Sequence, residues 1–158
     1  MTRRPAPGLR DFGTTPRVNS AQIVRVRKLE SLKAWKKGQA LAHAAYHITM
    51  HPGLRHHFAL VDQIRRAALS IPANITEGYA LSTTPQFIRG VRISLGSAAE
   101  LLSHLQVLER LALVPPEPVR DAIALTEDVL SLLVGLLKAL NRRSQHSSRF
   151  PLPTSPSR

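Results

Sequence analysis

The chain has 158 residues and a hydrophobic content of 43%, which predicts one domain with a core of ordinary size. Aromatic residues make up only 4%, and the abundant Leu, Ala, Ile and Val favour packed helices over a sheet. The absence of Cys excludes disulfides, thiolate metal sites and Cys nucleophiles, and it leads us to expect a cytoplasmic protein. No apolar run reaches the roughly 18 residues of a membrane-spanning helix, and the basic N-terminus lacks the apolar region of a secretory signal. We therefore expect no membrane partner.

The formal net charge of +12 is concentrated at the two ends of the chain. Residues 1–28 carry +6 and residues 142–158 carry +4, whereas residues 29–141 carry only +2. Both ends are rich in Pro, Ser and Thr, so we predict disordered basic tails over 1–28 and 142–158, around a folded domain over 29–141. A basic tail is often an arm for nucleic acid, and the alternative is an extension that only raises solubility.

The first predicted element is an amphipathic helix over about residues 29–51, which Pro52-Gly53 ends. Its apolar residues fall within one arc of roughly 140° at 100° per residue. They are Ala34, Trp35, Leu41, Ala42, Ala45 and Ile48. The opposite face carries His43, His47 and His51, a spacing that binds zinc when a further ligand arrives. Because residues 31–61 otherwise supply mainly basic side chains, we expect exposed histidines and no metal site.

The second predicted helix covers about residues 54–79 and contains a proline. Apolar residues recur every three or four positions, namely Phe58, Val61, Ile64, Ala68, Ile71 and Ile75. Because this spacing stays in phase across Pro72, we expect a kink and not a break. A polar stripe lies beside it, formed by Arg66, Ser70, Asn74 and Glu77. Near the kink these groups should satisfy backbone carbonyls or one another, and the alternative is a ligand site.

The third predicted helix begins after a polar loop, with Thr84 as its cap and Pro85 at its first position, and ends near Val114. Its apolar seam is Ile88, Val91, Leu95, Ala98, Leu102 and Leu105. Gly90 and Gly96, like Gly135 further on, stand inside helical patterns. Each costs about 1 kcal/mol relative to Ala, and close helix packing would explain that cost.

The fourth predicted helix follows Pro115-Pro116-Glu117-Pro118 and carries two adjacent apolar stripes. A helix of a monomeric bundle needs one such stripe, so the second predicts self-association. The alternative is a central helix that its neighbours bury. The candidate interface residues are Val129, Leu132, Leu136 and Leu137. Together the four elements predict an all-α fold, an antiparallel four-helix bundle with short connections.

Three segments in order carry a resemblance to a known family. The longest is Gln63-Ile64-Arg65-Arg66-Ala67-Ala68-Leu69-Ser70-Ile71-Pro72-Ala73-Asn74-Ile75-Thr76-Glu77-Gly78. The others are the segment Leu32–Lys37 and the two pieces Phe87–Ile93 and Gly96–Leu101. Together they resemble the bacterial four-helix-bundle family named after 23S ribosomal RNA intervening sequences, over roughly residues 29–141.

The resemblance implies a compact bundle that assembles as a ring-like homopentamer. Related accessory variability determinant proteins of diversity-generating retroelements bind nucleic acid and a reverse transcriptase. Two positions depart from the family pattern, because Leu81 and Leu95 stand where the family tends to have basic residues. These departures shift the expected phosphate-binding charge from the bundle towards the tails.

Seven cations of the predicted domain are candidates for phosphate contact: Lys33, Lys36, Lys37, Arg65, Arg66, Arg89 and Arg92. The alternative is a set of solvated or ion-paired side chains, with Glu77 and Glu100 as partners. No arrangement of residues points to catalysis, a cofactor or a metal. The leading hypothesis is a non-enzymatic oligomer that binds RNA or DNA without sequence specificity. The second is a protein–protein adaptor, with a reverse transcriptase as one candidate partner.

Overall fold

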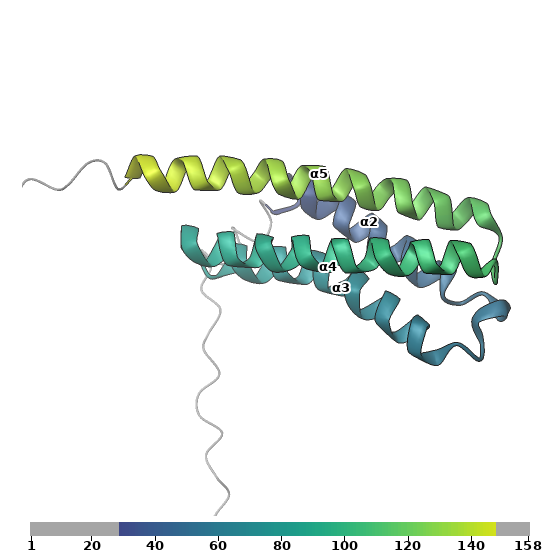
Figure 1. Ribbon diagram of the computed structural model, residues 1–158. Helices are drawn as coiled ribbons and strands as arrows, with labels where there is room; N and C mark the ends of the chain where they lie inside the picture. Colours follow the sequence, from purple (N-terminus) through teal and green to yellow (C-terminus); the bar gives the residue numbers. More distant parts are fainter. Residues whose placement is uncertain (1–28, 148–158) are drawn as a thin grey trace, which may run out of the picture.

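Four long helices make up the folded part of the chain, for which the computed structural model describes residues 29–147. They are α2 (Lys33–Ile48), α3 (Phe58–Ala80), α4 (Thr84–Leu111) and α5 (Pro116–Ser147), with a short 3-10 helix η1 (Pro52–Leu54) between α2 and α3. Successive helices run in opposite directions, as Figure 1 shows, and α5 packs against both α4 and α2. The predicted all-α bundle is confirmed. The predicted tail over 1–28 lies outside the described residues, and so does the last part, 148–158, of the predicted tail over 142–158.

The core fills the space between the four helices, and every helix contributes fully buried aliphatic side chains. Examples are Leu41 of α2, Ile64 and Ile71 of α3, Leu101 and Leu105 of α4, and Leu133 of α5. Trp35 is partly buried, and its indole Nε1–H donates a hydrogen bond to Oγ1 of Thr76 at 2.9 Å. The indole therefore ties α2 to α3 by a polar contact as well as by packing.

The proline inside α3 bends the helix without ending it. The helix continues through Pro72 to Ala80, and Figure 1 shows α3 changing direction partway along its length. Side chains bond to the backbone carbonyls around the bend. Asn74 Nδ2 donates to the carbonyl of Ser70, and Ser94 Oγ of α4 donates to the carbonyl of Ile71, both at 2.8 Å. The predicted kink is confirmed, and Asn74 of the polar stripe bonds to a carbonyl beside it, as does Ser94 of α4.

The ends of α4 differ by a few residues from the prediction. The N-cap is Thr83 and not Thr84, because Oγ1 of Thr83 accepts a bond from the Gln86 N–H at 3.4 Å. At the other end the helix stops at Leu111, three residues before the predicted limit. Ala112 adopts the left-handed conformation with φ 49° and ψ 35°, which reverses the chain towards α5. This conformation is unfavourable for a residue with a Cβ atom.

Close helix packing accounts for one of the three glycines inside the helical patterns. A Cβ atom on Gly90 would collide with the carbonyl oxygen of Asn74 and would lie 3.1 Å from the Cα of Gly78. The α3 and α4 backbones therefore touch at this pair of glycines. Gly96 and Gly135 are exposed, and a Cβ atom on either would meet nothing within 4 Å in the described part of the chain. For these two the expectation of close packing within the chain is wrong.

The helix α5 extends beyond the predicted boundary of the domain. It continues to Ser147, so residues 142–147 are helical and not part of a disordered tail. Arg142 and Arg143 consequently lie on a helix surface. Within residues 29–147, no helix is long and apolar enough to cross a membrane.

Candidate nucleic-acid interface

The three candidate lysines lie on the first two turns of α2. Lys33 and Lys36 are exposed, and Lys37 forms an ion pair with Asp128 of α5. The first turns of α2 lie beside α5, so this ion pair joins the surfaces of two neighbouring helices. Lys33 and Lys36 keep their charge directed to solvent, whereas the charge of Lys37 is partly met within the chain.

The two candidate arginines of α3 have contacts of their own. Arg65 Nε donates to Thr49 Oγ1 at 2.9 Å, and its guanidinium lies 4.5 Å from the centre of the Tyr46 ring. These contacts hold α3 against the end of α2 by a hydrogen bond and a cation–π interaction. Arg66 is exposed and lies 4.0 Å from Asp62, one turn earlier on the same helix. For Arg65, a structural role within the chain therefore explains these contacts better than phosphate binding does.

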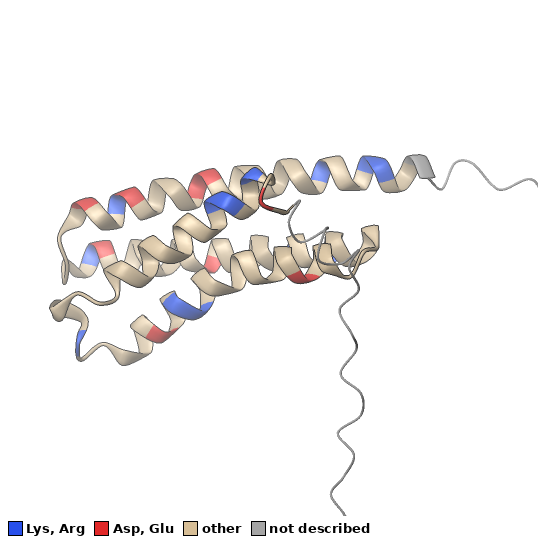
Figure 2. Cartoon of the chain, turned by 180° about the vertical axis from the view of Figure 1, so that it is seen from behind, with Lys and Arg blue, Asp and Glu red and all other residues tan. Residues whose placement is uncertain are grey.

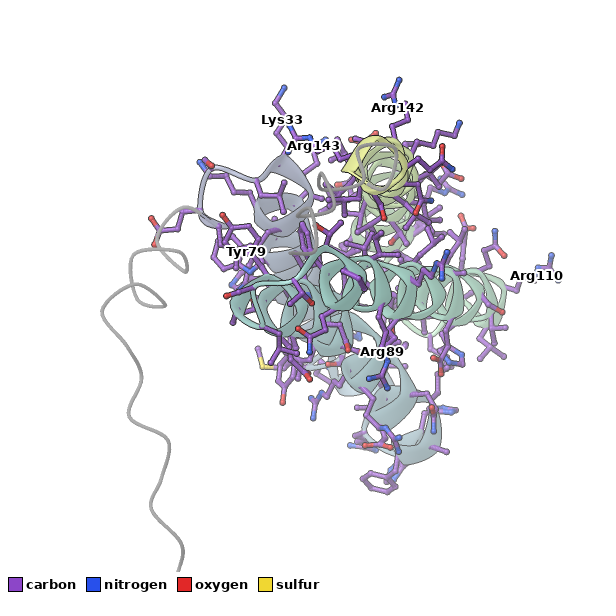
Figure 3. All side chains as sticks on the ribbon, turned by 90° about the vertical axis from the view of Figure 1, so that its left-hand side faces the viewer. Lys33, Tyr79, Arg89, Arg110, Arg142 and Arg143 are labelled. Carbon is purple, nitrogen blue, oxygen red and sulfur yellow. The ribbon has the colours of Figure 1, made fainter. Side chains whose placement is uncertain are left out.

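Arg89 and Arg92 lie on the outward face of α4 and are both exposed. In Figure 3 the side chain of Arg89 points to the side of the bundle opposite Lys33. The structure thus separates the seven candidate cations and does not bring them into one patch. Glu77 and Arg89 both line a cavity of about 260 Å³ between the end of α3 and the start of α4. Glu100, the other expected acidic partner, lies 3.5 Å from Nε2 of His104.

A different group of cations gathers on the last turns of α5. Lys138, Arg142 and Arg143 lie there and are exposed. Figure 3 shows Arg142 and Arg143 on the same side of the molecule as Lys33, although α5 extends beyond the start of α2 in Figure 1. We call Lys138, Arg142 and Arg143 the basic end. Both arginines fall within the predicted C-terminal tail. The signal that could have placed them on α5 is the absence of any Pro or Gly between Gly135 and Pro151.

Acidic side chains occupy the other half of α5. The first three turns and the middle of this helix carry Glu117, Asp121, Glu127 and Asp128, as the red segments of Figure 2 show. Near the α4–α5 connection, Glu109 Oε1 accepts a bond from Arg120 Nε at 2.9 Å. This hydrogen bond and the adjacent carboxylate charge raise the pKa of Arg120 above its usual value. The charge of α5 is therefore polarised along its axis.

The polar stripe of α3 forms a network with α4. Asn74 Nδ2 also donates to Ser70 Oγ at 2.9 Å, and Ser97 Oγ of α4 lies 2.9 Å from the same Ser70 oxygen. Ser70 and Arg66 line a cavity of about 170 Å³ that also borders Glu100. Because Ser70 and Asn74 bond to one another and to the backbone, their part of the stripe supports the helix crossing.

The four candidate interface residues of α5 do not share one environment. Val129 is fully buried in the core of the chain itself, so it offers no surface to a second copy and is removed from the predicted interface. Leu132, Leu136 and Leu137 pack against the core but remain partly accessible. The second apolar stripe of α5 is therefore covered only in part by the neighbouring helices.

Within residues 29–147, no three His, Asp or Glu side chains lie close enough together to hold a metal ion. His43, His47 and His51 lie on one wall of a cavity, with a single carboxylate among its other lining residues.

Comparisons with known proteins agree with this architecture. The chain resembles the crystal structure of a protein of unknown function from the S23 ribosomal protein family of Bacteroides thetaiotaomicron, at 24% sequence identity and a TM-score of 0.59. The match covers 66% of this chain and 98% of that one, and at this identity it supports the fold alone. No curated protein matches the chain. The sequence model of the 23S rRNA-intervening sequence proteins matches residues 30–135, about two thirds of the chain. The chain therefore belongs to the 23S rRNA-intervening sequence protein family.

Proposed function

We propose that the protein is a non-enzymatic, oligomeric helical bundle that binds nucleic acid through its basic end, without sequence specificity. One observation carries the proposal. The last turns of α5 carry three exposed cations, and Figure 3 shows Arg142 and Arg143 on the same side of the molecule as Lys33 of α2. In the sequence, residues 1–28, with a net charge of +6, precede the lysines of α2, and residues 148–158 follow the arginines of α5. Cations from α2 and α5, far apart in the sequence, thus face one side of the described bundle.

The chemistry of the basic end suits a phosphate backbone. Its Lys and Arg side chains are exposed, so each can approach a phosphate and release the counterions condensed on the nucleic acid. Contacts of this kind set position and carry no sequence information. The acidic half of α5 repels phosphate, which orients the nucleic acid towards the basic end. Assembly of several copies would multiply a weak contact into useful affinity.

The test measures how binding depends on salt. Fluorescence anisotropy of labelled RNA and DNA duplexes should show a steep fall in affinity as salt rises for the full chain. A variant with K138Q, R142Q and R143Q should bind more weakly at low salt. The slope of log affinity against log salt should become shallower by about 2–3, because three phosphate contacts are lost and each contributes about 0.7–0.9.

A control neutralises two arginines at the opposite end of the bundle. The R110Q and R120Q variant should keep the salt slope of the natural chain, because both residues lie beside the α4–α5 connection. An equal loss for each neutralised charge in the two variants would show that only total charge matters, which contradicts a localised basic end. No binding by the full chain near physiological salt would reject the proposal as a whole.

The partly accessible leucines of α5 favour a second candidate function, a protein–protein adaptor. Leu132, Leu136 and Leu137 present apolar surface of the kind that protein partners cover. A reverse transcriptase is the candidate partner that the resemblance implies. Such a complex would persist at high salt, because apolar burial is insensitive to screening, whereas phosphate binding would be lost.

A further inference from the structure

A cavity of about 480 Å³ lies between the second half of α2 and the start of α5, away from the basic end. Its volume falls within the roughly 300–1,000 Å³ of small-molecule sites. The α4–α5 connection closes one side of it through Val114 and Pro115. Gly53 of η1 packs directly against that connection, because a Cβ atom on Gly53 would collide with the carbonyl oxygen of Leu113. The cavity thus lies between packed elements and not under a free loop.

Most of the cavity wall is apolar. The aliphatic and proline side chains come from both helices and from the connection between α4 and α5. The residues that give this character are Ala44, Ile48, Val114, Pro118, Ala122 and Leu125. A ligand that enters must therefore present a hydrocarbon or aromatic body, because a fully polar molecule would lose its hydration without replacement bonds.

Three imidazoles stand along the α2 side of the cavity. The rings of His43 and His47 are 5.6 Å apart and tilted by 48°. Nδ1 of His51 accepts a hydrogen bond from the Gly53 N–H at 3.1 Å, so the proton of its neutral ring lies on Nε2. The prediction that these three histidines are exposed is confirmed, and their exposed face also forms one wall of the cavity.

Asp121 of α5 supplies the only carboxylate among the residues that line the cavity, and no Lys or Arg lines it. The lining residues thus offer a carboxylate and no ammonium or guanidinium group to a ligand. The start of α5 offers little to an anion, because Pro116 and Pro118 have no backbone N–H and Glu117 lies in the first turn. Electrostatic complementarity therefore favours a cation.

We propose that this cavity binds a small aromatic or aliphatic amine, with its hydrocarbon body against the apolar wall and its ammonium group at Asp121. The ammonium donates to the carboxylate, and a neutral imidazole accepts a further bond. The titratable groups that face the amine are His43, His47 and His51 of one wall and Asp121 of the other.

The test uses three probes that share a benzene ring and differ in charge. They are 2-phenylethylamine, 2-phenylethanol and phenylacetate, titrated into the full chain at pH 7.5 and followed by amide chemical shifts. The amine should shift resonances of Ala44, Asp121 and Ala122 in a saturable way and bind more tightly than the alcohol. Phenylacetate should bind most weakly.

Two pairs of variants locate the binding. D121N should weaken amine binding about tenfold while leaving the alcohol unchanged, whereas D62N on α3 should change neither. Ala44→Phe should fill the cavity and abolish binding of the amine and the alcohol, and Ala99→Phe, on the exposed face of α4, should not. Circular dichroism checks that all four variants fold. Tighter binding of phenylacetate at pH 7.5, no saturable shift with the amine, or unchanged amine affinity in D121N or Ala44→Phe would overturn the proposal.

Discussion

At the scale of single residues, the neighbours of each side chain decide its role more than its chemical type does. Arg65 and Arg92 are both helical arginines of the candidate patch, yet Arg65 is bonded to Thr49 and stacked on Tyr46 while Arg92 is exposed. Successive residues of an α-helix point about 100° apart around its axis. Cations that are adjacent or close in the sequence therefore reach different partners, and a count of charges does not reveal this.

The left-handed residue after α4 gives a prediction for stability. Ala112 has φ 49°, where a Cβ atom is strained and glycine is not. Ala112→Gly should raise the free energy of unfolding by about 0.5–1 kcal/mol, measured by urea denaturation. The control is Ala124→Gly on the exposed face of α5, which should lower it by about 1 kcal/mol. Destabilisation by both changes would mean that Ala112 is not left-handed in solution.

At the scale of elements, the crossing of α3 and α4 depends on backbone contact. Gly78 and Gly90 approach closely, and Ser70, Asn74, Ser94 and Ser97 supply hydrogen bonds at and beside the bend. The proline removes one backbone donor, and the neighbouring polar side chains bond to carbonyls within the same turns. The bend and the glycine contact therefore form one structural unit that places α3 along α4.

Two glycines of α4 provide a matched test of this unit. Gly90→Ala should lower the free energy of unfolding by about 1–3 kcal/mol, because its Cβ atom meets the Asn74 carbonyl oxygen. Gly96→Ala should raise it by about 1 kcal/mol, because the site is open and alanine favours the helix. Thermal and urea unfolding of both variants measure the difference. A stabilising Gly90→Ala would contradict the close approach of the two helices.

At the scale of the whole molecule, charge and apolar surface divide the bundle. The basic end and the acidic half of α5 lie at opposite ends of one helix, and the His-lined cavity lies towards the acidic side. Partly accessible leucines run along α5 between the two charged regions. A molecule arranged in this way can assemble through α5 while its basic end stays available to a phosphate backbone.

At this scale we predict that the protein self-associates. Light scattering at micromolar concentration should give a mass that is a multiple of the 17.4 kDa chain. The double variant Leu132→Lys and Leu136→Lys should dissociate it, because two ammonium groups replace apolar contacts. Val107→Lys, at an exposed position of α4, serves as the control and should not. A mass near 17 kDa for the natural chain would reject the oligomer.

Much of the architecture could be predicted because it depends on local patterns. Apolar spacing of three and four residues marked all four helices, and the phase of that spacing across Pro72 predicted a bent helix. The helix boundaries were predicted less accurately: the N-cap of α4 is Thr83 and not Thr84, and α5 continues to Ser147. Helix ends depend on single hydrogen bonds and on one backbone conformation, which several neighbouring residues could provide.

For the candidate site, the sequence predicted which residue types contribute but not how they are arranged in space. The sequence by itself determined the helical class, the family and the presence of surplus positive charge, because periodicity, motif order and net charge are properties of the chain alone. Only the tertiary structure decided which charges lie near one another, since the packing of α2 against α5 pairs Lys37 with Asp128, 91 positions later, and sets Lys33 on the same side of the molecule as Arg142 and Arg143. It also buried Val129 and made three histidines the wall of a cavity. Such proximity follows from packing between helices, and a pattern along one helix does not encode it.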